Sequence, residues 1–183
     1  MFVYDDSMRA ALTIIGLVAS ERIGELFLAR RNQRRLIAAG GREVGASHYP
    51  LIVAVHAGWL VAMAVYVVAV RPGVHPVPLI AFIAVQPLRL WVIATLGRFW
   101  TTRIITLPGA PLVRRGPYRF IRHPNYAIVV AEIALLPLAF GAWSLAAIFS
   151  LLNAGVLTLR TRAENAALAE RQGLAANTRR AIS

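Results

Sequence analysis

Long apolar blocks separated by polar, arginine-rich segments make up most of the chain. Residues 51–70 carry no formal charge, and a helix of that length would be about 30 Å long, enough to cross the hydrocarbon core of a bilayer. Residues 77–96 form a second block of the same length. Residues 8–29 begin apolar and become polar in their last third, which predicts a helix with one polar end. These blocks therefore predict three long helices in the first half of the chain.

The last apolar block, residues 126–159, is too long for a single membrane crossing. Pro137 and Gly141 interrupt it, and these two residue types are the strongest local breakers of a helical pattern. We therefore expect a helical hairpin made of two short antiparallel helices, at about 127–139 and 143–159.

The tail continues the helical pattern to about residue 172, and Gly173 is the predicted stop. No internal repeat, low-complexity tract or linker divides the sequence. We expect one all-α integral membrane domain over 1–183, with about five transmembrane helices. Its N-terminal helices would occupy 1–111 and its functional half 112–172.

The composition supports this fold class. Hydrophobic residues make up 58% of the chain and charged residues only 15%, and the mean hydropathy is +0.61. Such values argue against a water-soluble domain, so the net charge of +12 points to a membrane or an anionic ligand and not to nucleic acid. The absence of cysteine excludes disulfides and thiolate metal sites. The four histidines lie in separate segments without metal-binding spacing, so we expect no metal.

All 20 basic residues are arginine, and most of them fall in three segments, 30–49, 97–125 and 160–183. With five helices these segments share one face of the membrane, and the other face has only Arg9 and Arg71. Cytoplasmic loops are enriched in Lys and Arg. We therefore expect the N-terminus outside, the C-terminus and the functional site in the cytoplasm, and a bacterial inner-membrane location.

The densest polar segment is LVRRGPYRFIRHPNY, residues 112–126. Gly116 and Pro117 predict a turn, and Pro124 disturbs any helix that continues through it, which leaves backbone groups near His123 free for a ligand. Asn125 is expected to cap the following helix. The alternative is an interfacial loop whose arginines contact lipid phosphates.

Arg160 and Glu164 are four residues apart and therefore lie on one face of a helix. They could form a simple surface ion pair of about 0.5 kcal/mol. Alternatively, the arginine fixes an anionic substrate while the carboxylate holds an amine or hydroxyl of a ligand. The pattern alone does not separate these hypotheses.

Together, the pattern G-x-Y-x-x-x-R-H-P-x-Y at residues 116–126 and the later R-x-x-x-E of Arg160 and Glu164 resemble the isoprenylcysteine carboxyl methyltransferase (ICMT) family of integral membrane enzymes. The resemblance implies a membrane O-methyltransferase that uses S-adenosylmethionine, releases S-adenosylhomocysteine and encloses the cofactor in a cytoplasmic pocket. Arg160 and Glu164 would be the catalytic residues. The implied cofactor-binding residues come from residues 112–126, called the histidine segment below, and from the last helix: Leu112, Val113, Tyr118, His123, Pro124, Asn125, Tyr126 and Glu164.

The substrate is expected to be lipophilic and to enter from the bilayer, where the protein also contacts membrane lipid. The family name implies a prenylcysteine carboxylate, which is already ionised and needs only an orienting cation such as Arg160. The N-terminal half resembles bacterial relatives that act on polyketide lipids such as alkylpyrones or alkylresorcinols, whose phenol or enol benefits from a base. Candidates for that base are Glu21, Glu25 and His123.

Arg89 lies deep in an apolar helix, where an unpaired charge costs several kcal/mol. It either pairs with Glu132 or lies at the substrate pocket. With Arg160, Glu21 and Glu25, it completes the expected substrate-binding set. Two other functions remain open from the residues: an NADPH-dependent membrane reductase, and a membrane protein that binds anionic lipid without catalysis.

Overall fold

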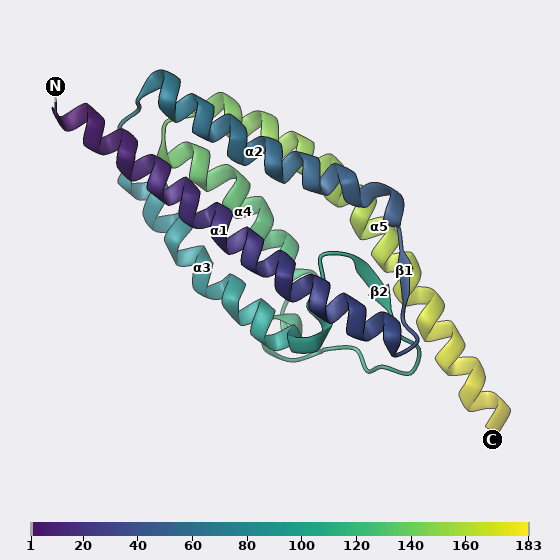
Figure 1. The fold of residues 1–183 in the computed structure, drawn as a ribbon. Coiled ribbons are helices and arrows are strands. Elements are labelled where there is room, and N and C mark those ends of the chain that lie inside the picture. Colours follow the sequence, from purple (N-terminus) through teal and green to yellow (C-terminus); the bar gives the residue numbers. More distant parts are fainter. Residues whose placement is uncertain (1, 183) are drawn as a thin grey trace.

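Five helices form an elongated bundle in the computed structural model, which describes residues 2–182 and the side chains of residues 6–169. They are α1 (Phe2–Ala38), α2 (Tyr49–Val70), α3 (Pro76–Leu96), α4 (Pro124–Ala139) and α5 (Trp143–Ile182). Successive helices run in opposite directions, so the two ends of the chain lie at opposite ends of the bundle (Figure 1). This arrangement confirms the expected all-α membrane fold.

Three segments in the described part of the chain are long and apolar enough to cross a membrane: Ala46–Val70, Pro76–Phe99 and Trp143–Ala169. In their most apolar windows, only 17%, 22% and 11% of the residues are buried inside the protein. Most of these apolar side chains therefore face outward, as they do in a protein surrounded by lipid. Helix α4 is apolar but shorter, and the total of five crossings remains a prediction.

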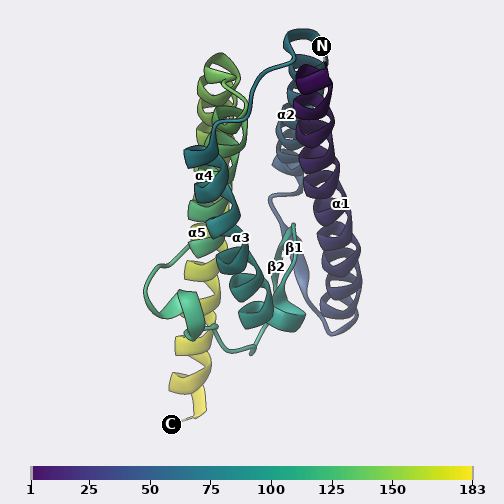
Figure 2. The ribbon, with the colours of Figure 1, turned by 90° about the vertical axis from the view of Figure 1, so that its left-hand side faces the viewer.

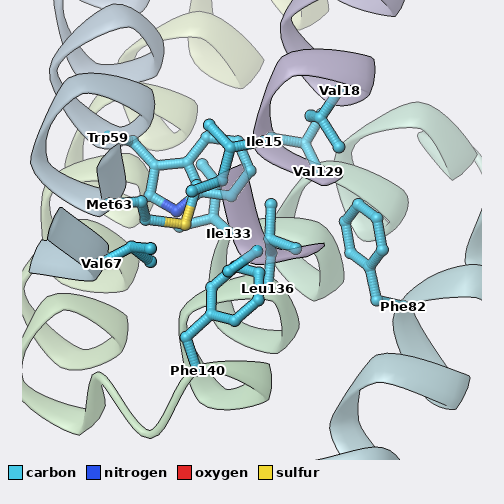
Figure 3. Close-up of a cluster of buried hydrophobic side chains, with 11 residues drawn as sticks. Ile15, Val18, Trp59, Met63, Val67, Phe82, Val129, Ile133, Leu136 and Phe140 are labelled. Atoms are coloured by element: carbon cyan, nitrogen blue, oxygen red, sulfur yellow. The ribbon is translucent and has the colours of Figure 1, made fainter. Parts of the chain in front are cut away.

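Side chains from α1, α2, α3 and α4 interdigitate in the main core (Figure 3). Trp59, Met63 and Val67 lie on one face of α2, where i, i+4 and i+8 positions align. They pack in one cluster with buried α4 residues that include Ile133 and Leu136. This core fixes the spacing of the helices around the site.

Three predicted features of the elements are wrong. A two-stranded antiparallel sheet pairs β1 (Arg42–Val44) with β2 (Ile104–Thr106), and no strand was expected. Helix α1 extends beyond the predicted 8–29 at both ends. Helix α5 continues past Gly173 to Ile182, because one glycine costs a helix only about 1 kcal/mol and the neighbouring residues are mostly strong helix formers.

The arginine-rich segments lie together at one end of the bundle, because they follow the first, third and fifth of five helices that alternate in direction. The end of α1, the small sheet, the connection from α3 to α4 and the end of α5 all lie there (Figure 2). Asn32 in α1 anchors the chain after α3, since its Nδ2 donates to the carbonyl oxygens of Gly97 (3.0 Å) and Trp100 (2.9 Å). This end of the molecule holds the candidate site.

Candidate active site

The histidine segment leaves β2 and reaches α4 through a short 3₁₀ turn, η3 (Gly116–Arg119). Gly116 has a φ of 56°, and a Cβ at this position would lie 2.4 Å from the Thr95 Oγ1. Glycine is therefore required both for the backbone conformation and for the close approach to α3. The turn thus holds the segment against the bundle.

Helix α4 begins at Pro124, with His123 in the capping position and no side-chain capping bond. The prediction that Asn125 caps this helix is wrong. Proline is favoured at the first helical position because its fixed φ suits the helix and it has no N–H to satisfy. Asn125 therefore falls inside the first turn, where it lines two of the cavities described below.

The Tyr126 hydroxyl joins the two charged residues of α5. It donates to the Glu164 carboxylate and accepts a hydrogen bond from Arg160 Nε at 2.9 Å. The Tyr126 ring stacks on His123 with 5.2 Å between ring centroids and 9° between planes. Within the described residues Arg160 and Glu164 form no direct ion pair, so the i, i+4 surface pair weighed from the sequence is not the arrangement present.

Two neighbouring hollows lie between the histidine segment and α5. The outer cavity, of about 820 Å³, includes Leu112, Val113, Tyr118, His123 and Glu164 in its wall. The inner chamber, of about 160 Å³, shares the last three of these residues and adds Asn125 and Tyr126. Seven of the eight residues expected to hold a cofactor therefore line these two neighbouring hollows. Pro124 is buried and lines neither hollow.

Three polar atoms of the residues that line these hollows are buried without a hydrogen-bond partner among the described residues. They are Nε2 of His123, Oδ1 of Asn125 and Nε1 of Trp100. Leaving such an atom unsatisfied costs about 1–3 kcal/mol, so these atoms are suited to a bound polar ligand. Burial, and secondarily the nearby Glu164 carboxylate, raises the pKa of the Tyr118 phenol, which therefore stays protonated at neutral pH.

A third hollow, the membrane cavity, has a volume of about 330 Å³ and lies among α1, α2, α4 and α5. Its wall is mostly apolar, with side chains such as Ile52, Leu60 and Val129. Asn125, Tyr126 and Arg160 line both this cavity and the inner chamber. The spaces on the two sides therefore meet at the Tyr126–Arg160 hydrogen bond.

Arg89 belongs to a buried ion network at the edge of the membrane cavity. It binds the Glu25 carboxylate through Nε and Nη2, and it donates through Nη1 to Glu132 at 2.8 Å. Arg22 donates to Glu25 and to Glu132, and it lies 3.6 Å from Glu21. The pairing of Arg89 with Glu132 is therefore present. Arg89 also lines the membrane cavity, and its place at a substrate pocket stays a prediction. Glu21 and Glu25 are paired, and of the two only Glu25 reaches the cavity wall.

Sequence reasoning missed Arg22 and His56, which also line the membrane cavity. Arg22 lies between Glu21 and Glu25 in the sequence, and such a cluster of charged residues indicates the exposed end of a helix. His56 is the one histidine in an apolar run. That interruption was the available signal for a polar group facing inward.

The family model described as "Isoprenylcysteine carboxyl methyltransferase (ICMT) family" matches residues 78–170. This chain belongs to the isoprenylcysteine carboxyl methyltransferase family. A curated relative, "Uncharacterized protein YpbQ" of Bacillus subtilis (strain 168), is 37% identical over 160 residues, which cover 86% of this chain and 95% of the relative. No solved structure matches the chain significantly.

Membership in the isoprenylcysteine carboxyl methyltransferase family makes the chain a methyltransferase of the membrane. The matched range contains α3, the histidine segment, α4 and both charged residues of α5. It omits α1 and α2, which contribute Arg22, Glu25 and His56 to the membrane cavity. The membrane cavity is thus built partly from residues outside the family match and partly from matched residues such as Arg89, Tyr126 and Arg160.

Proposed function

We propose that this protein transfers a methyl group from S-adenosylmethionine to an acidic oxygen of a lipophilic substrate. The observation that carries the proposal is the meeting of two unlike spaces at Tyr126 and Arg160. One space has a mixed polar and apolar wall and lies at the arginine-rich end; the other is mostly apolar and lies within the bundle. A water-soluble donor and a lipid acceptor need such an arrangement, because proximity at a fixed site supplies much of the rate of a displacement reaction.

The residues of the outer cavity and inner chamber suit the cofactor. His123 Nε2 and Asn125 Oδ1 are unpartnered polar atoms, Glu164 can accept from an amine or hydroxyl, and Leu112 and Val113 offer apolar surface. When bound there, S-adenosylmethionine supplies an electrophilic methyl group on a sulfonium. The chain itself binds the donor, excludes water from the junction and orients the acceptor oxygen.

Arg160 provides the cation for a carboxylate acceptor of the isoprenylcysteine type. A second acceptor class, the phenol or enol of a polyketide lipid such as an alkylpyrone or alkylresorcinol, is favoured by a specific observation. The ion network beside the cavity contains three carboxylates and two guanidinium groups. Arg160 lines the same cavity and brings the guanidinium groups to three, so with every group ionised the charges balance and a substrate that arrives neutral keeps that balance.

Binding of labelled S-adenosylmethionine to the purified protein in lipid nanodiscs tests the cofactor. We expect saturable binding, weakened at least tenfold in His123→Ala and in Glu164→Gln. His75→Ala is the matched control, because His75 lies at the other end of the bundle, beside Gly141. Saturable binding of NADPH in its place would favour a reductase, and salt-sensitive binding of anionic vesicles with neither cofactor would favour a lipid-binding protein.

Incubation with methyl-labelled donor, host lipid extract and a prenylcysteine analogue identifies the acceptor. We expect one lipid product to carry the label in the wild type and none in Arg160→Gln. Absence of both donor binding and labelled product would reject the methyltransferase. A reporter fused after residue 183 tests the proposed inner-membrane orientation, and we expect its activity in the cytoplasm.

A further inference from the structure

His56 lines the membrane cavity from the middle of α2. Its Nδ1 lies 2.8 Å from the carbonyl oxygen of Ile52. A carbonyl can only accept, so Nδ1 carries the hydrogen, and the neutral ring must present a lone pair at Nε2. Nε2 has no hydrogen-bond partner among the described residues, and the ring forms part of the cavity wall. The helix backbone therefore fixes His56 as a hydrogen-bond acceptor toward the cavity.

Charged groups of both signs act on the His56 ring: the Glu132 carboxylate attracts an imidazolium, and the Arg22 and Arg160 guanidinium groups repel it. The charged and titratable groups that share the cavity or border it come from four helices: Glu21, Arg22 and Glu25 of α1, Arg89 of α3, Tyr126 and Glu132 of α4, and Arg160 of α5. These groups comprise three carboxylates and three guanidinium groups, so the partner that stabilises an imidazolium here is the substrate oxyanion formed with it.

The other base candidates are less suited to this task. The Glu25 carboxylate already accepts from Arg22 and Arg89. His123 lines the outer cavity and the inner chamber and stacks on Tyr126, so it is on the donor side of the junction. Glu21 does not line the membrane cavity. This leaves His56 as the acceptor of protons on the lipid side.

We propose that His56 is the catalytic base for a lipophilic substrate that carries a phenol or enol hydroxyl, an inference that rests on the proposed methyltransferase function. Nε2 forms a bond to the substrate proton while the O–H bond breaks and its electron pair stays on oxygen. The net charge of the cavity does not change, because an imidazolium and an oxyanion form together. The oxyanion is then the nucleophile for the methyl group, and the imidazolium returns its proton to water after the product leaves.

A long-chain nitrophenol tests the proton transfer without any donor, because its ionised form absorbs at a longer wavelength. We expect the nitrophenol to ionise when it binds the wild type at a pH below its own pKa. In His56→Asn and His56→Gln it should bind with affinity within about threefold but remain a phenol. The matched control, His75→Asn, should behave as wild type. Equal ionisation in wild type and His56→Asn would overturn the proposal.

A measurement on the wild type alone guards against a variant that fails to fold. With ¹⁵N-labelled histidine, addition of the nitrophenol should convert one ring from a neutral Nδ1–H tautomer to an imidazolium. No conversion would overturn the proposal. Failure of the proposed methyltransferase function can be distinguished from failure of this inference. It would appear as an absence of S-adenosylmethionine binding, which is measured independently of nitrophenol ionisation.

Discussion

Removing the cation of Arg89 should destabilise the bundle strongly. Arg89→Met keeps the length and apolar stem of the side chain but deletes three charge-assisted hydrogen bonds, two to Glu25 and one to Glu132. The side chain of Arg89 is only 6% exposed, so water cannot replace those bonds. Breaking a buried pair costs about 3–5 kcal/mol. Because Arg22 still donates to both acids, we expect the lower value, about 3 kcal/mol.

Reversible unfolding in mixed detergent–SDS micelles measures this loss. Arg103→Gln is the comparison, because its 2.5 Å ion pair with Glu43 lies at the polar end with side chains 32% and 22% exposed, and should contribute at most about 1 kcal/mol. Adding Glu132→Gln to Arg89→Met restores the charge balance and should recover about 1–2 kcal/mol. A loss below about 1 kcal/mol for Arg89→Met would show that the network is not a structural requirement.

Three further substitutions test other parts of the site. Tyr126→Phe removes the hydroxyl that joins the two charged residues of α5. We expect methyl transfer to slow about tenfold and the free energy of unfolding to fall as well, since a hydrogen bond to a charged group contributes about 1.5–3 kcal/mol; an unchanged rate would contradict the role of this hydroxyl. Gly116→Ala forces a Cβ against α3, and we expect weaker donor binding, measured by titration, with the exposed Gly109→Ala as comparison. Asn32→Ala leaves two carbonyls unsatisfied and should lower the free energy of unfolding by about 1–3 kcal/mol; a loss within error would mean that water replaces both bonds.

The helices formed by long apolar runs could be predicted from the sequence. Helices α2 and α3 begin and end within two residues of the predicted bounds, because a mostly apolar run of that length has few alternatives to a membrane helix. The sheet between β1 and β2 could not be predicted. Its two strands are three residues each and lie far apart in the chain, so their pairing depends on the bundle that brings them together.

The candidate site divides in the same way. The proposed donor side follows mainly from one contiguous segment, and its residues line the outer cavity and the inner chamber. The proposed substrate side is assembled from separate residues of five helices, each unremarkable in its own segment. Whether Glu25 is a free base or a bound one depends on Arg89, which is 64 positions away. The tautomer of His56 likewise depends on a backbone carbonyl that no residue pattern specifies.

Helix α5 is 40 residues long, about 60 Å at 1.5 Å per residue, and it carries Arg160 and Glu164 one turn apart. The separation between the lipid side and the donor side is therefore set by the pitch of a helix and not by a loop. A single inserted residue between these two positions would rotate one of them by about 100° away from Tyr126. Insertions in the loop at 107–115 leave that register intact. Sequence lengths in this family should therefore vary in the loop and stay fixed within this one turn.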